Sequence, residues 1–289
     1  METILQLIVS GIAFGCIYCM VAIEFSLIFN ASGLINFGHD KFIMLGAYIF
    51  GGTMVNHLGV NFFLAFTVAL ALMGLFGAAV AAGIFNPLRN MPSDLYAVMG
   101  TIMLAKVLGE VARLVWGPQP FTVENFLVGT VRVGDIALPR ASIYIILASV
   151  VFLYLQNLLF KKTKIGKAMR CVAQDKVAAA IMGINVSRNI LLTVAFSSVI
   201  CGIIGIMIIP VFHVEVNMAN MIGLKGFAAS VVGGFGTVAG AIAGGLFIGL
   251  SENMYLVFGP AIYKDVVAFV LLILFLLIRP EGIVSRTSR

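Results

Sequence analysis

Charged side chains inside apolar segments are the residues of this sequence that could do chemistry. Glu24 lies late in the first apolar run, and Lys106, Glu110 and Arg113 lie in a later one. Each such group costs about 2.5–3.5 kcal/mol at the centre of a membrane helix, and such groups often mark the route of a substrate. The i,i+4 and i,i+3 spacing lets the latter three form one internal ion-pair stripe, for which a structural role is favoured. Glu24 has no obvious local partner and is a candidate for a translocation path, with packing as the alternative.

A polar break between the first two apolar runs offers two more candidates. The stretch "GLINFGHDK", residues 33–41, places Asn36 and His39 between them. It is either the end of a broken helix beside a pathway or a short loop. We therefore take Asn36 and His39, with Glu24, as candidate path residues.

Motifs for ATP hydrolysis, nucleophilic catalysis and metal binding are not found. "KIGKAM" contains a Gly-Lys pair but has neither the upstream glycine nor the following Ser or Thr of a P-loop. There is no nucleophile elbow or HExxH. Three of the four cysteines (Cys16, Cys19 and Cys201) lie in apolar runs, and Cys171 lies in a basic stretch, so packing is expected for them. We expect no enzyme activity, cofactor or metal in this chain; a gradient or a partner must supply any energy.

The composition indicates an integral membrane protein. Hydrophobic residues make up 61% and charged residues 10% of the chain, against about 25% charged in soluble domains. The apolar runs are long rather than alternating, which predicts helices instead of a β-barrel. The net charge of +6 is explained by Lys and Arg in cytoplasmic loops, so no nucleic-acid partner is expected.

The predicted fold is an all-α polytopic membrane protein of about eight transmembrane helices, forming one permease domain over residues 1–289. The apolar runs are 4–30, 42–56, 62–86, 94–116, 141–160, 189–213, 226–256 and 262–279. The basic segment 161–188 and the tail 279–289 should both be cytoplasmic. Loop 87–92, with Arg89, then falls inside, and loop 117–139, with a β-hairpin in "VGTVRVGDIAL", falls outside.

Because segment 161–188 and the tail 279–289 are both predicted to be cytoplasmic, the chain between them must cross the membrane an even number of times. Three apolar runs lie between them, so segment 219–256 should be broken. It would enter as a short arm that ends near Gly233 and Gly234 and turn back as a helix from about Thr237. Gly233, Gly234 and Gly236 are therefore candidates for the translocation path.

The basic stretch "KKTKIGKAMRCVAQDKVAAAIMGINVSRN", Lys161 to Asn189, holds seven of the 18 Lys and Arg residues and one acid. Its spacing predicts two short helices. Asp175 can cap the second, 176–182, and Gly183 sits where a left-handed glycine ends it. The small apolar faces suit a groove on another protein; the alternative is a basic helix that lies on anionic lipid.

The stretch "GKAMRCVAQDKVAAAIMGIN" resembles the coupling segment of permease subunits of branched-chain amino acid ABC importers. Three further stretches, 32–48, 223–252 and 263–283, are similar to other parts of that family, and the length resembles the shorter of its two permeases. The sequence departs from the family at Glu24, where a small residue is expected, and at 39–41. The residues that carry the coupling resemblance are Gly166, Ala168, Arg170, Ala173, Gln174, Asp175, Ala178, Ala179, Gly183 and Ile184.

The resemblance implies a bacterial cytoplasmic (inner) membrane protein that forms half of a translocation path. Its partners would be a homologous second permease, two ATP-binding subunits that hold ATP and Mg and grip residues 165–185, a periplasmic or surface substrate-binding protein, and the bilayer. Substrates in the family also include amides, urea, and aromatic or other carboxylates. A gradient-driven secondary transporter of a small polar solute is the alternative, for which Glu24, Glu110 and Glu252 offer thin support as a proton relay.

Overall fold

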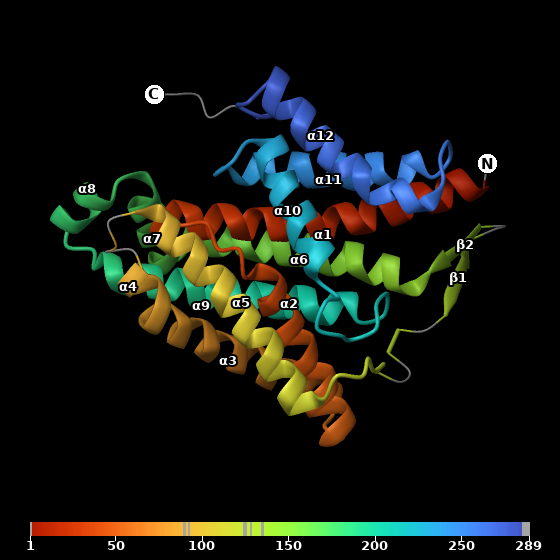
Figure 1. The fold of residues 1–289 in the computed structure, drawn as a ribbon, viewed down its shortest axis with the longest axis horizontal. Coiled ribbons are helices and arrows are strands. Elements are labelled where there is room, and N and C mark those ends of the chain that lie inside the picture. The colour runs from red at the N-terminus through yellow and green to blue at the C-terminus, as the bar shows by residue number, and fades with distance from the viewer. Residues whose placement is uncertain are drawn as a thin grey trace. The chain divides into compact units, whose positions relative to one another are not determined.

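The computed structural model describes residues 2–88, 91, 93–123, 126–127, 129–133 and 136–284, and its helices and strands are labelled in Figure 1. Contacts divide the chain into two units, each built from separated segments. Unit 1 comprises Met1–Ser26, Asn125–Phe152 and Asn220–Arg289; unit 2 comprises Leu27–Glu124 and Leu153–Ala219. That both units act as one permease domain stays a prediction. Arg89 and the tail residues 285–289, used above to orient the chain, lie outside the described residues.

Unit 2 is built around α9, which packs against α2 and α3 through glycines. A Cβ added at Gly202 would lie 3.0 Å from the Met73 side chain on α3, and Gly46 on α2 faces the backbone of Gly202. Such small residues let helices approach closely in a membrane. The elements of this unit are the end of α1 (Glu2–Ser32), α2 (His39–Ala47), η1 (Tyr48–His57), α3 (Phe62–Val80), η2 (Ala81–Phe85), α4 (Asn86–Leu88), α5 (Asp94–Trp116), the end of α6 (Arg140–Lys162), α7 (Lys164–Gln174), α8 (Lys176–Ile181) and α9 (Val186–Ile208).

Unit 1 contains most of α1, the start of α6, and the C-terminal helices α10 (Asn220–Gly233), α11 (Val238–Tyr255), η3 (Ala261–Tyr263) and α12 (Lys264–Ile278). Helices α1 and α11 touch through glycines: a Cβ at Gly11 would lie 3.1 Å from the carbonyl oxygen of Gly249. The predicted hairpin is confirmed as β1 (Thr130–Val133) paired antiparallel with β2 (Ile136–Pro139), in a register that sets Thr130 opposite Pro139.

Helices cover all eight predicted apolar runs, which confirms the all-α polytopic class, but the described residues form six candidate membrane spans, or seven with the bent pair, rather than about eight. Within the described residues, six helices are long and apolar enough to cross a membrane. They are 4–32, 62–88, 95–116, 140–162, 186–208 and 261–278. The other two elements are the continuous helix α2–η1 and the bent pair α10–α11.

The predicted broken element is present as α10 and α11, whose axes differ by 119°. Helix α10 ends at Gly233, and Gly234 and Gly236 follow with φ of +115° and +87°, which favour glycine. The hydroxyl of Thr237 then caps α11 by accepting from the Gly240 N–H at 3.1 Å. The return helix therefore begins where the sequence predicted, and Figure 1 shows the two arms joined by this turn.

The chain after α12 closes the end of α10. The N–H groups of Ile283 and Val284 each donate a 2.9 Å hydrogen bond, to the carbonyls of Val232 and Gly233 respectively. These carbonyls belong to the last turn of α10 and have no partner within the helix. The C-terminal segment thus supplies a backbone cap to the broken helix.

Candidate functional site

The predicted coupling segment forms the two capped helices α7 and α8. Asp175 Oδ1 accepts hydrogen bonds from the N–H groups of Val177 at 2.7 Å and Ala178 at 3.0 Å. Gly183 adopts φ of +82°, and the Ile184 N–H reaches back to the Ala179 carbonyl at 3.0 Å. These contacts confirm the predicted N-cap and the glycine stop.

The ten predicted coupling residues separate into an outward and an inward set. Gly166 and Ala179 are buried, and a Cβ at Gly166 would collide with the backbone of Leu159 and Phe160 at the end of α6. These two residues therefore hold α7 and α8 against the rest of unit 2. The exposed members are Arg170, Gln174, Asp175, Ala178 and Gly183, and the half-buried ones are Ala168, Ala173 and Ile184.

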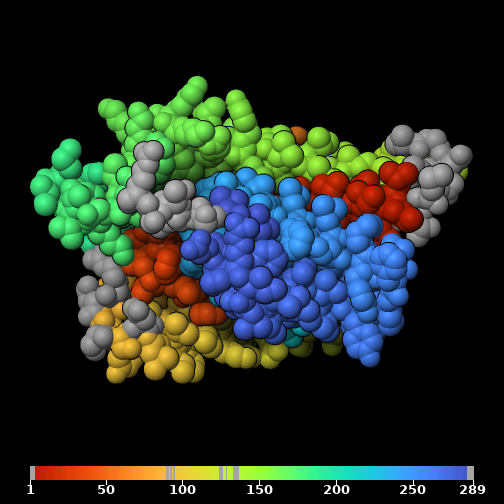
Figure 2. Space-filling model, turned by 90° about the horizontal axis from the view of Figure 1, so that it is seen from above, coloured from red at the N-terminus to blue at the C-terminus, as the bar shows by residue number. Residues whose placement is uncertain are grey.

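The apolar surface of this segment comes from larger side chains than the sequence suggested. Val177 is 70% exposed, and Ile181 and Met182 are each 81% exposed. Ile165 on α7 is also exposed, whereas Met169 and Val172 are buried. The i,i+4 spacing of Val177 and Ile181 was the signal for this outward face. Figure 2 shows the atoms of the segment, teal-green in the view, lying open on the surface.

Helix α8 is also tied to the end of α1 within unit 2. The Lys176 ammonium donates a 2.8 Å hydrogen bond to the carbonyl of Ser32, the last residue of α1. Gly33, with φ of +83°, ends that helix by donating its N–H to the Phe29 carbonyl at 2.7 Å. A cation suits the negative end of a helix dipole. Lys176 therefore completes the C-terminal cap of α1.

Two of the predicted path residues lie together at the break between α1 and α2. Asn36 is fully buried, and its side-chain oxygen accepts the Gly38 N–H at 2.9 Å, which shapes the turn. His39 is the buried first residue of α2, and its carbonyl oxygen lies 3.9 Å from the Cys201 thiol. Thr101 on α5 supports the same break by accepting the Phe37 N–H at 3.3 Å. The break is therefore an ordered turn in which Asn36 and His39 are buried, while Phe37 is exposed.

The remaining path candidates are a buried acid in α1 and three glycines of a turn. Glu24 is completely buried in α1. Gly233, Gly234 and Gly236 form the turn between α10 and α11 in unit 1. That these residues line a path stays a prediction.

The predicted ion pair between Glu110 and Arg113 is present on α5, but the charged stripe is exposed and not internal. Arg113 and Glu110 form a 2.9 Å ion pair, with 46% and 65% of their side chains exposed, and Lys106 is exposed beside them. The buried side of α5 carries small residues instead. The i,i+3 and i,i+4 spacing predicted that the charges share a stripe, but it could not say which side of the helix faces the protein.

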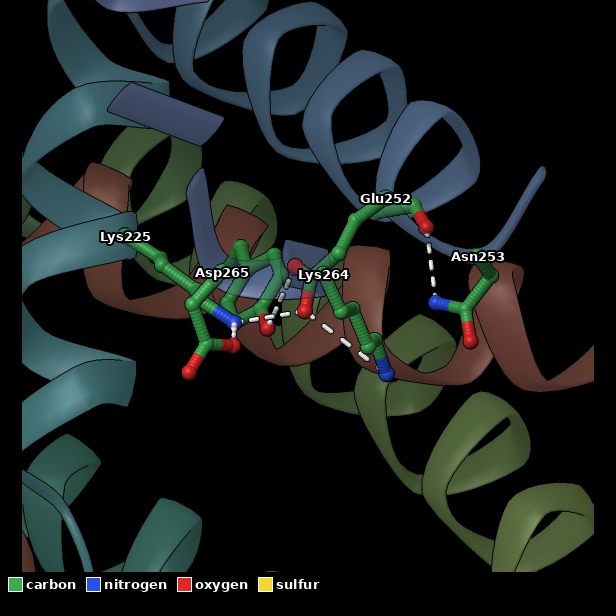
Figure 3. A network of polar contacts seen from close by, with 7 residues as sticks. Lys225, Glu252, Asn253, Lys264 and Asp265 are labelled. Atoms are coloured by element: carbon green, nitrogen blue, oxygen red, sulfur yellow. Dashed lines mark hydrogen bonds and ion pairs between the residues drawn. The ribbon is translucent and has the colours of Figure 1, made fainter. Parts of the chain in front are cut away.

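A buried ion cluster in unit 1 joins α1, α10, α11 and α12 (Figure 3). Lys225 Nζ lies 2.5 Å from Glu252 Oε1 and 2.6 Å from Asp265 Oδ1. The Tyr18 hydroxyl donates to Glu252 Oε2 at 3.1 Å, and Lys264 Nζ lies 3.6 Å from Glu252 Oε1. Sequence reasoning missed this cluster because its members lie far apart along the chain.

The ion cluster holds the two arms of the broken helix, α10 and α11, together. Lys225 and Glu252 are 4% and 1% exposed, so both charges have lost most of their water. Removing one partner of such a pair costs about 3–5 kcal/mol, because the other charge stays buried without compensation. The two arms of α10 and α11 are therefore locked to each other and to the start of α12.

The comparisons with known proteins define the class. The family model described as "Branched-chain amino acid transport system / permease component" matches residues 7–276. The permease protein LivH of the high-affinity branched-chain amino acid transport system of Escherichia coli (strain K12) is 30% identical, over 98% of this chain and 96% of LivH. BraD of Pseudomonas aeruginosa, whose name gives the same system, is 28% identical over 98% of this chain and 96% of its own length. A probable ABC transporter permease of Sinorhizobium fredii, y4mJ, is 25% identical over 64% of this chain and 57% of its own length.

The chain is thus a multi-pass membrane transport permease rather than an enzyme. It belongs to the family of branched-chain amino acid transport system permease components. Among solved structures, PsaBC from Streptococcus pneumoniae in complex with Fab aligns with a TM-score of 0.46 and 15% identity, over 97% of this chain and 91% of that one. That likeness is too weak to carry an argument.

Proposed function

We propose that this chain is a transmembrane subunit of an ATP-driven ABC importer for branched-chain or related amino acids, and that it docks an ATP-binding subunit through residues 165–185. The names of LivH and BraD support the substrate class, and that of y4mJ supports the ABC assembly. The assembly would contain a homologous second permease, two ATP-binding subunits that hold ATP and Mg, and a substrate-binding protein. Its place would be the bacterial cytoplasmic (inner) membrane.

The observation that carries this proposal is the exposed apolar group of Val177, Ile181 and Met182, outside the spanning helices. Around it lie exposed polar side chains, including Arg170, Gln174 and Asp175. An apolar centre with a polar rim is the usual anatomy of a protein interface. Helix α8, with six residues, is too short to bury much area in lipid, which favours a protein groove over a membrane surface.

A gradient-driven transporter has less support. Glu252 is engaged by Lys225, Lys264 and Tyr18, and Glu110 is paired with Arg113. Two of the three acids considered for a proton relay are therefore held in ion pairs. Glu24, the third acid, is completely buried in a spanning helix.

The test is reconstitution of the complex with the candidate ATP-binding subunits, the second permease and the binding protein. We expect ATP-dependent uptake of branched-chain amino acids, and we expect Ile181→Asp with Met182→Asp to abolish co-purification of the ATP-binding subunit. Val131→Asp in β1, an exposed apolar position outside the segment and outside the spanning helices, serves as the control and should retain it. Uptake by this chain alone, driven by a proton or sodium gradient without ATP, would overturn the proposal.

A further inference from the structure

Helix α5 carries an ammonium group near the middle of a membrane span, on an exposed face. Lys106 is the thirteenth residue of the 23-residue helix Asp94–Trp116. At 1.5 Å per residue its Cα lies about 18 Å from one end of the helix and about 15 Å from the other. Lysine side chains that snorkel to the membrane–water interface lie near the ends of helices. Lys106 therefore needs water or a counter-charge at its own depth.

The described residues of the chain do not supply that counter-charge. Glu110, one turn along, is engaged by Arg113 at 2.9 Å. Among the residues that the structure describes, no acid lies within ion-pair distance of Lys106. The Glu110–Arg113 pair is neutral as a whole, so one positive charge remains on this face.

The other side of α5 supports the break that holds two candidate path residues. Thr101, Ala105 and Ala112 are buried on that side. A Cβ at Gly38 would lie 3.2 Å from the Thr101 carbonyl, and a Cβ at Gly109 would lie 3.4 Å from Val216. Helix α5 is thus held in a defined rotation, with its small residues against the break and its charges turned away from unit 2. The exposure of the charges follows from packing and not from a loose helix.

We propose that the charged face of α5 lines the water-filled translocation path and that Lys106 receives the carboxylate of the amino acid in transit. This inference rests on the proposed function. Ionisable groups within membrane segments face a bundle interior or an aqueous cavity, and they mark substrate routes. The carboxylate of a small zwitterion supplies the negative charge that Lys106 lacks. Glu110 and Arg113 lie at i+4 and i+7 from Lys106, on the same face of α5. Their charged groups give the ammonium and the carboxylate of the passing amino acid a polar surface.

Chemical rescue in the reconstituted complex tests the inference. Every variant is compared with a Cys171→Ser parent, whose own uptake is the reference, because Cys171 is the exposed thiol and the other three cysteines are buried. We expect Lys106→Cys and Lys106→Met to lower ATP-driven uptake by about tenfold or more, as for the loss of one charge-assisted contact, and Lys106→Arg to retain it. A water-borne aminoethyl thiosulfonate reagent, which rebuilds an ammonium on the thiol of the Lys106→Cys variant, should restore uptake. A sulfonate reagent of the same kind should react without restoring it.

The control is Val151→Cys in the same background. Val151 lies at the centre of α6 and is 56% exposed among apolar neighbours. It should neither react nor change uptake, because that face meets hydrocarbon. Normal uptake by Lys106→Met, or no reaction of Lys106→Cys with either reagent in a transporting complex, would overturn the inference alone. If the unmodified complex shows no ATP-driven uptake, the proposed function fails, and the inference fails with it.

Discussion

The ammonium of Lys176 on α8 donates a 2.8 Å hydrogen bond to the carbonyl of Ser32 at the end of α1. This contact joins the helix proposed to dock an ATP-binding subunit to a spanning helix. Ser32 lies four residues before Asn36, in the break between α1 and α2. A displacement of α8 would therefore act directly on the element that holds two candidate path residues.

Replacing Lys176 should separate docking from transport. We expect Lys176→Met to keep the ATP-binding subunit in the purified complex, because the side chain points towards α1 and not outwards. The lost hydrogen bond involves a charged group and is worth about 1.5–3 kcal/mol, so uptake per ATP hydrolysed should fall. Parallel assays of ATPase activity and uptake measure this ratio. Lys176→Arg should restore it in large part, and an unchanged ratio in Lys176→Met would show that the contact carries no coupling.

Breaking the buried ion cluster should destabilise unit 1. We expect Lys225→Met to lower the free energy of unfolding by about 3–5 kcal/mol, since Glu252 would remain buried with its main partner gone. The melting temperature of the detergent-purified chain measures this. Lys264→Met is the matched control and should cost much less, because its ammonium lies 3.6 Å from Glu252 and is 23% exposed. Equal losses for the two variants would contradict the assigned roles.

The cap at Asp175 gives a local prediction. Asp175→Ala removes the acceptor for the Val177 and Ala178 N–H groups and should cost about 1 kcal/mol. Amide hydrogen exchange over 176–181 should accelerate while exchange in α9 stays as in the parent. Asp175→Asn keeps the acceptor and should preserve protection. Faster exchange in Asp175→Asn equal to that in Asp175→Ala would indicate that charge, and not the cap, holds α8.

Local features of this fold were predictable because they depend on neighbours in the chain. The Asp175 cap, the Gly183 stop and the turn at Gly233–Thr237 all follow from residue type and short spacing, and the structure confirms each one. The spacing of the α5 charges was equally clear, yet their placement inside the protein was wrong. Periodicity shows that residues share a stripe, but packing decides where that stripe faces.

By itself, the sequence determined the membrane class, the helices of the apolar runs, the broken helix and the two short helices of the basic segment, because hydrophobicity, charge and turn chemistry act over a few residues. Only the tertiary structure decided that Gly166 and Ala179 face inward while Val177 and Ile181 face outward. It also brought Lys225 to Glu252 and Asp265, across 27 and 40 residues. The physical reason is that the rotation of each helix is set by the neighbours it packs against, and those neighbours are distant in the sequence.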